Sequence, residues 1–153
     1  MAGSSRGLRT GIVLVDMRGW LKLVGTADWK LPELWAIERR DLLREARFSE
    51  LHPPDPSSRG DHLVYHAVGY QRIVAVVEYL DDEPSLDPHP SEWEKKWPLI
   101  LRVQPLLRIS RVSAGPLSSS LGELPDRSHQ GFVPLTEAQL RLAEAQLQGA
   151  GGS

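Results

Sequence analysis

Tryptophans are the residues of this sequence best suited to bind a ligand. The chain has five of them, against two phenylalanines and three tyrosines. Trp93 and Trp97 lie four residues apart in a polar loop rich in proline, acids and lysine, where a core residue is not expected. Two aromatic rings at the edge of a barrel can hold a flat heterocycle, and stacking one base on such a ring contributes about 1–3 kcal/mol. The pair therefore indicates a base-binding pocket, with burial in a core as the alternative.

Stacking alone does not hold a base that must first leave a duplex, because extracting it costs a few kcal/mol. Phosphate contacts or a single-stranded partner must supply the remainder. Arginines are the candidates for these contacts, in two clusters around residues 39–47 and 102–111. The net charge of −2 argues against a purely electrostatic nucleic-acid binder. We expect phosphate contacts from Arg39, Arg40, Arg102 and Arg108; the alternative is a solvated surface.

Catalytic motifs are missing from the sequence. It has no cysteine, which excludes thiol nucleophiles and iron–sulfur sites, and it has no phosphate-binding glycine loop and no His-Glu-x-x-His motif. His62 and His66 are about 13 Å apart if they share a strand, too far for one metal ion. We predict no catalytic residue, no metal site and no cofactor.

The segments that must position these residues are those of an α+β protein. Short apolar runs predict strands, and a capping box formed by Thr136 and Gln139 starts a helix that ends at Gly149. The expected strands are 11–16, 61–67, 72–80 and 99–110, with 61–80 forming a hairpin, and the expected helices are 17–24, 33–45 and the C-terminal one. We expect a partly closed β-barrel flanked by helices in one domain, 11–148, after a flexible tail, 1–10. No targeting or membrane segment is visible, so a cytoplasmic monomer is expected.

The order of several motifs resembles the EVE domain family of the PUA-like superfamily, which also includes YTH domains. Residues 34–37 (Leu-Trp-Ala-Ile) are similar to the family's Trp-Gly-Val segment, and 59–66 (Arg-Gly-Asp-His-Leu-Val-Tyr-His) resemble its Gly-Asp strand. A tryptophan pair before a strand (93–103) and a closing segment (130–136) follow in the same order. The resemblance covers residues 11–147 and implies a PUA-like barrel.

The resemblance further implies a non-catalytic nucleic-acid-binding module, for DNA or RNA, that reads a modified base such as a methylated one. In this hypothesis Trp35, Trp93 and Trp97 wall an aromatic pocket, and Tyr65 and His66 hydrogen-bond to the edge of the base. Two other functions remain open. One is a nuclease, another nucleic-acid-modifying enzyme or its accessory subunit, using His62, His66 or the acids 81–83. The other is a protein- or small-ligand-binding module that uses the acidic loop 81–94.

Overall fold

The computed structural model describes residues 19–24, 30–50, 53, 59–92, 94–122 and 132–151. The strand predicted at 11–16 and the tail 1–10 lie outside these residues. Within them, no helix is both long enough and apolar enough to cross a membrane.

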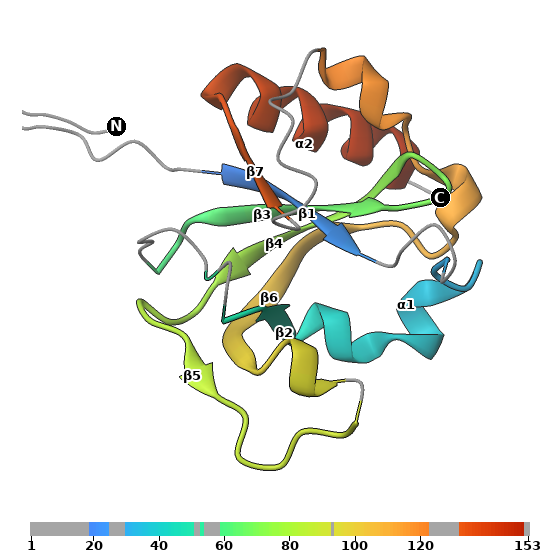
Figure 1. The fold of residues 1–153 in the computed structure, drawn as a ribbon. Helices are drawn as coiled ribbons and strands as arrows, with labels where there is room; N and C mark the ends of the chain where they lie inside the picture. Colours follow the sequence, from blue (N-terminus) through green and yellow to red (C-terminus); the bar gives the residue numbers. More distant parts are fainter. Residues whose placement is uncertain are drawn as a thin grey trace, which may run out of the picture.

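A single mixed sheet forms the body of the protein (Figure 1). Its hydrogen-bonded order is β2-β6-β4-β3-β1-β7, and β5 pairs with β6 outside this path. Only β1 and β3 run parallel; the other neighbours are antiparallel. The strands are β1 (Gly19–Val24), β2 (Glu45–Phe48), β3 (His62–Ala67), β4 (Arg72–Tyr79), β5 (Ser85–Leu86), β6 (Leu99–Arg108) and β7 (Phe132–Leu135).

The predicted hairpin is confirmed by β3 and β4, and the predicted strand 99–110 by β6. Every residue of β3 is buried, as expected of a strand covered on both faces. The turn between β3 and β4 contains Gly69, whose φ is 92°. Glycine adopts this positive φ at low cost because it has no Cβ atom. This hairpin forms the centre of the sheet.

The predicted helix at 17–24 is wrong over residues 19–24, which form β1; residues 17 and 18 lie outside the described residues. Its apolar residues alternate between two buried faces: Trp20 stacks on Tyr79 on one side, and Gly19 lies against Leu140 on the other. Burial on both sides together with pairing to β3 and β7 outweighs a helical spacing of three apolar residues. The chain uses this segment to join the middle of the sheet to its β7 edge.

The predicted helix at 33–45 is shorter than expected. It consists of α1 (Trp35–Glu38) and the 3₁₀ turn η1 (Arg40–Leu43), after which the chain enters β2. Pairing of β2 with the start of β6 ends the helical stretch. The remaining 3₁₀ turns are η2 (Glu94–Lys96), η3 (Val112–Ala114) and η4 (Ser118–Leu121).

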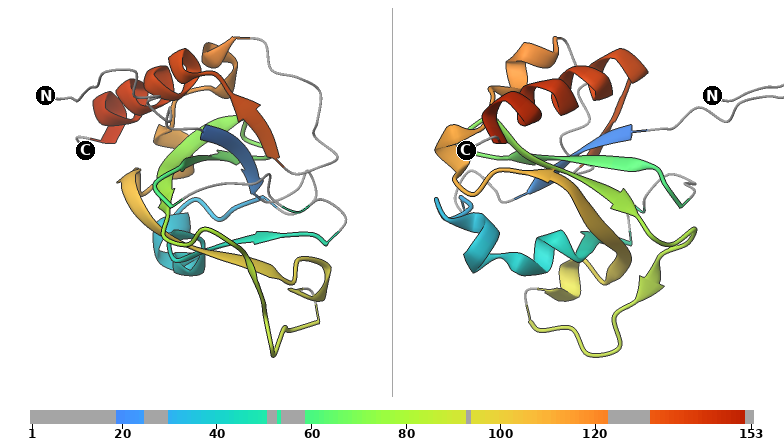
Figure 2. Two further views of the ribbon diagram at one scale, coloured as in Figure 1. Left: turned by 90° about the vertical axis from the view of Figure 1, so that its left-hand side faces the viewer. Right: turned by 180° about the vertical axis from the view of Figure 1, so that it is seen from behind.

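The C-terminal helix α2 (Glu137–Gly151) begins with the predicted capping box. The Thr136 N–H donates to Gln139 Oε1 at 2.9 Å, and the Gln139 N–H donates to Thr136 Oγ1 at 3.1 Å. The helix runs two residues past Gly149. Its buried residues Leu140, Ala143 and Leu147 pack on the sheet. The helix α2 lies on one side of the sheet, and α1 with η1 on the opposite side (Figure 2).

The sheet curls until its two edges approach each other. Phe48 of β2 and Phe132 of β7 come from opposite ends of the strand order, yet their ring centroids are 5.7 Å apart at an interplanar angle of 78°. Among the described residues no strand ladder joins these two edges, and the contact between the two rings bridges them. The fold is an α+β half-barrel with flanking helices, as predicted. We call the line where β7 and β1 face β2 the seam.

Candidate functional site

The concave face of the sheet is lined by aromatic rings. Trp20 stacks on Tyr79 with centroids 6.0 Å apart and an angle of 20°, and Trp35 meets Tyr65 edge to face at 6.4 Å. Paired strand residues point to the same side of a sheet, so the register places these rings on the face that also carries Phe48 and Phe132. The sequence folds its aromatic residues around one interior.

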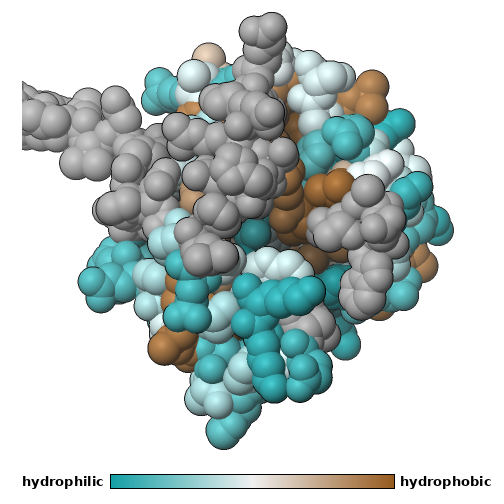
Figure 3. All heavy atoms as spheres, viewed as in Figure 1, coloured by the Kyte–Doolittle hydropathy of each residue, from teal (hydrophilic) through white to brown (hydrophobic). Residues whose placement is uncertain are grey.

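One lysine shares this aromatic face. Lys22 of β1 pairs with Tyr65 on one side and with Phe132 on the other, and its Nζ lies 5.0 Å from the centroid of the Phe48 ring. Lys22, Phe48 and Phe132 therefore mark the seam from three different strands. Apolar side chains reach the surface near the middle of the face seen in Figure 1, with hydrophilic residues around them (Figure 3).

Burial changes the acid–base behaviour of Lys22. Removal from water disfavours the charged ammonium and lowers the pKa of Lys22 to about 8. Within the described part of the chain, no carboxylate forms an ion pair with this ammonium, and its aromatic contact is with Phe48. A cation over a ring face gains roughly 0.5–2 kcal/mol. The seam thus holds a positive group that has no carboxylate partner among the residues the structure describes.

Trp35 and Tyr65 lie together, but both are enclosed. Each is 0% exposed. The Trp35 indole N–H donates to the carbonyl oxygen of Ile109 at 2.9 Å, and the Tyr65 hydroxyl donates to the carbonyl oxygen of Leu42. Burial raises the pKa of Tyr65, so the phenol stays neutral. In this structure both polar groups are satisfied within the protein, and neither ring faces an open pocket.

His66 does not share a pocket with Tyr65, in contrast to the sequence-based expectation. Adjacent strand residues point to opposite faces of a sheet, and His66 lies on the convex side, hydrogen-bonded through Nδ1 to Ser118 Oγ. Burial lowers the pKa of His66 and favours its neutral form. The residues predicted to read a base edge are therefore separated by the sheet.

Trp97 is half-buried at the start of β6. It lies two residues before Leu99, which pairs with Phe48, so the chain at Trp97 runs beside the end of β2. Its carbonyl oxygen accepts a hydrogen bond from Arg47 Nη1 at 3.2 Å. Trp93 lies outside the described residues, and the prediction that three indoles meet around one slot stays a prediction at that position.

The four arginines predicted to hold phosphates divide into two kinds. Arg39 is paired with Asp41 at 3.1 Å, and Arg102 with Asp81 at 2.7 Å. Hydrogen bonds from Arg102 hold the pKa of Asp81 below its usual range. Arg40 and Arg108 are exposed and have no ion-pair partner among the residues that the structure describes. Exposed ion pairs contribute about 0–1 kcal/mol, so Arg39 and Arg102 can exchange a carboxylate for a phosphate.

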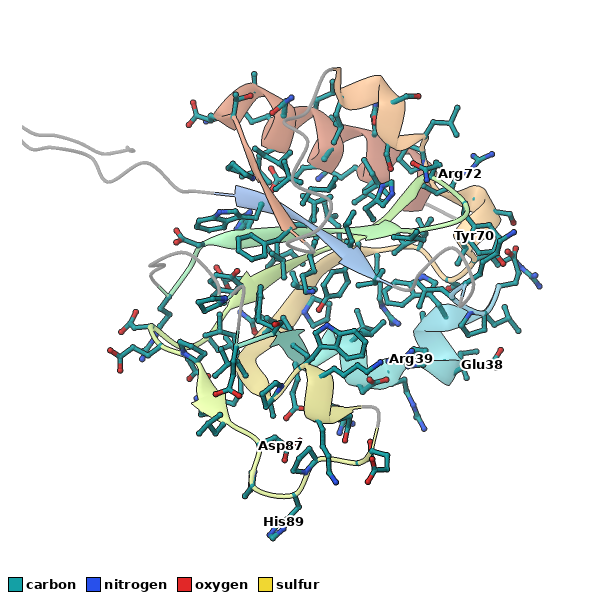
Figure 4. All side chains as sticks on the ribbon, viewed as in Figure 1. Glu38, Arg39, Tyr70, Arg72, Asp87 and His89 are labelled. Atoms are coloured by element: carbon teal, nitrogen blue, oxygen red, sulfur yellow. The ribbon has the colours of Figure 1, made fainter. Side chains whose placement is uncertain are left out.

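Arg47 has a role that sequence reasoning did not find. Its guanidinium binds Asp87 at 2.7 Å and Glu94 at 3.1 Å, in addition to the Trp97 carbonyl. These contacts hold the segment between β4 and β6 against β2. Figure 4 shows Asp87 and His89 on this segment, far from Tyr70 and Arg72 at the β3–β4 turn. The alternation in β2 indicates that Arg47 points away from Phe48, but its partners come from residues about 40 positions away.

The residues of the enzyme alternative do not gather in one place. His62 lies under α2, where its Nδ1–H donates to Glu144 Oε2 at 2.9 Å. Asp81 is engaged by Arg102, and Asp82 accepts a hydrogen bond from the backbone N–H of Arg59 at 2.8 Å. Across the described residues, no group of three metal-ligating side chains converges.

Comparison with known proteins identifies the fold. No protein-family model matches the sequence, and no curated protein matches it. Among solved structures, the chain is similar to the Mmi1 YTH domain in complex with RNA, with a TM-score of 0.60, 10% identity, and coverage of 88% of this chain and 79% of that one. It is also similar to the YTH domain of Zygosaccharomyces rouxii MRB1 in complex with N6-methyladenosine RNA, with a TM-score of 0.56, 11% identity and 90% coverage of both chains. The protein has a YTH-like fold.

Sequence reasoning also missed Lys22 as a charged residue on the aromatic face. The signal was present, because Trp20, Lys22 and Val24 share a face once this segment is a strand. A helix prediction over 17–24 concealed it.

Proposed function

We propose that this protein is a non-catalytic RNA-binding module that holds an unpaired, modified base at the seam. The observation that carries the proposal is the match of nearly the whole chain to two YTH domains described as RNA complexes. One of those complexes contains N6-methyladenosine RNA, which favours RNA over DNA and a methylated adenine as the first base to test. Membership of the EVE family is part of the same proposal.

Several residues on and near the concave face are the candidates for the groups that such a function needs. Trp97 is half-buried and lies two residues before the partner of Phe48, and its ring is the one we expect to stack on the base. Arg40 and Arg108 are exposed cations for the strand that carries the base. Trp35 and Tyr65 lie deeper on the same concave face. We expect Trp35 and Tyr65 to form the inner wall of the pocket when a bound base moves the groups that now cover them. Trp93 is the other expected wall.

Methylation by itself supplies limited selectivity. Burying one methyl group gains about 0.8 kcal/mol, which is roughly a fourfold gain in affinity. A stronger preference requires a pocket that leaves a polar group unpaired when the methyl is missing. We therefore expect a clear but moderate preference for the modified strand.

The test is an equilibrium titration with short single-stranded RNA, with and without N6-methyladenosine, and with DNA of the same sequence. Trp97→Ala should weaken binding of the modified RNA about five- to a hundredfold, the loss of one stacking contact. Trp97→Phe keeps a ring and should retain most of the affinity.

The matched control is Tyr70→Ala, because Tyr70 is also a half-buried aromatic residue but lies at the β3–β4 turn. It should bind as the wild type does. Tight, salt-sensitive binding of DNA in preference to RNA would overturn the RNA assignment. Absence of binding to every strand would overturn the function.

A further inference from the structure

Lys22 is the charged group whose position the fold explains least. Strand interiors on a concave face normally carry apolar side chains, and the neighbours of Lys22 in the ladder are Tyr65 and Phe132. Its Nζ reaches across the seam to the Phe48 ring at 5.0 Å. Three strands thus converge on one ammonium.

Other cations of the described chain show what Lys22 lacks. Arg39, Arg47 and Arg102 each have a carboxylate partner. Lys30 also lies over a ring, that of Tyr70 at 5.4 Å, but it is exposed to water. Lys22 alone among these combines partial removal from water with the lack of an anionic partner in the described residues.

An ammonium with no carboxylate partner among the described residues is costly to hold in such a place, and an anion that enters the seam removes the cost. The lowered pKa of Lys22 reflects this same cost, the free energy of removing a charged ammonium from water. A full negative charge offsets it better than a neutral carbonyl group, because hydrogen bonds between two charged groups are the stronger ones. In a nucleic-acid strand that charge is the phosphodiester.

Resting on the proposed function, we propose that Lys22 binds a phosphodiester oxygen of the RNA strand where that strand crosses the seam. The Phe48 and Phe132 rings then face the sugar and base beside this phosphate. Lys22 is a binding residue for the backbone and carries no sequence preference.

The experiment measures the affinity for single-stranded RNA as a function of salt concentration. Each phosphate neutralised on a single strand contributes about −0.7 to the slope of log K against log salt. Lys22→Met should weaken binding about tenfold or more, the loss of a charged hydrogen bond, and should reduce the magnitude of the slope by ~0.7. Lys22→Arg should keep the slope, and Lys30→Met, the matched control, should change neither quantity.

Three results separate the possibilities. A Lys22→Met protein that binds with the slope and affinity of the wild type overturns this inference and leaves the proposed function intact. Weaker binding with an unchanged slope assigns Lys22 to a base edge and overturns the phosphate contact. A wild-type protein that binds no strand overturns the proposed function itself.

A pH series on the wild type and Lys22→Arg gives a readout that does not depend on the folding of Lys22→Met. Wild-type affinity should fall above about pH 8, where the Lys22 ammonium loses its proton, and Lys22→Arg should show no such fall. Among the described residues, the other titratable groups on this side of the sheet include the phenols of Tyr65 and Tyr79 and the buried carboxyl group of Asp61, which directly precedes β3. The pKa of Tyr65 is raised by burial, so this phenol stays neutral over the range. An equal fall in both proteins would contradict the role of Lys22.

Discussion

Phe48 and Phe132 meet edge to face across the seam, although they belong to the two strands farthest apart in the sheet order. Both rings are buried, at 1% and 4% exposure. Among the residues that the structure describes, a side-chain contact therefore closes the half-barrel where a full barrel would have a hydrogen-bonded ladder. A closure of this kind can part locally and leave the sheet intact.

Removing either ring should destabilise the fold strongly. Phe48→Ala and Phe132→Ala should each lower the free energy of unfolding by about 3–5 kcal/mol, the usual cost of truncating a buried phenylalanine. The double variant should lose less than the sum, by about 0.5–1.5 kcal/mol, because each single change already removes the ring contact. Urea unfolding measures both quantities. Phe48→Ala combined with Leu147→Ala, under α2, should be additive, and strict additivity of the Phe48–Phe132 pair would contradict the closure.

His66 should make stability depend on pH. Burial lowers the pKa of His66, so its stabilising effect is complete above about pH 6.5, the ordinary histidine value, and is lost as the pH falls through the lower folded value. The melting temperature should decline below pH 6.5 in the wild type and decline less in His66→Gln. The exposed His89 serves as the control, and His89→Gln should keep the wild-type profile. Parallel profiles for wild type and His66→Gln would contradict this prediction.

The Arg47–Asp87 pair should be visible in the titration of a single carboxyl group. The hydrogen bond from Arg47 holds the pKa of Asp87 below its ordinary value. The contribution of this pair to the stability of the fold is present above about pH 3.9 and is lost as the pH falls through the lowered pKa of Asp87. By NMR, Arg47→Met should return the pKa of Asp87 toward about 3.9. Arg141→Met breaks an exposed pair within α2 and should leave the pKa of Asp87 unchanged. A similar shift of this pKa in both variants would contradict the role of the Arg47–Asp87 pair.

Lys22 should reduce stability at neutral pH. The pKa of Lys22, about 8, lies below the ordinary lysine value of about 10.4. The free energy of unfolding is therefore highest above about pH 10.4 and declines as the pH falls through 8. Lys22→Met keeps the apolar stem and removes the charge. Urea unfolding at pH 7 and pH 9 should show a more stable variant at pH 7 and a smaller difference at pH 9. A difference that does not change with pH would contradict the prediction.

Local patterns in the sequence were sufficient for much of the fold. The hairpin of β3 and β4, strand β6 and the capping box at Thr136 follow from alternation, β-branched runs and side-chain chemistry within a few residues. Strand β1 was mistaken for a helix because its pairing partners lie about 40 and 110 positions away. Tertiary pairing decided its conformation.

The site was less predictable, for the same physical reason. Tyr65 and His66 were grouped because they are adjacent, and the strand sends them to opposite faces. Trp35 has the ring expected of a pocket wall, yet its indole N–H donates a hydrogen bond to the carbonyl oxygen of Ile109, 74 residues away. The seam depends on how far the sheet curls, and a short segment of the sequence does not determine this curvature.

The proposed binding of an RNA strand along the seam involves β1, β2 and β7. Its most direct test is NMR mapping of backbone amide and indole N–H shifts while single-stranded RNA containing N6-methyladenosine is added. We expect shifts that cluster on β1, β2 and β7 around Lys22, Phe48 and Phe132, together with the Trp97 indole. Shifts confined to α2 or to the turn at Tyr70, with the seam unchanged, would contradict it.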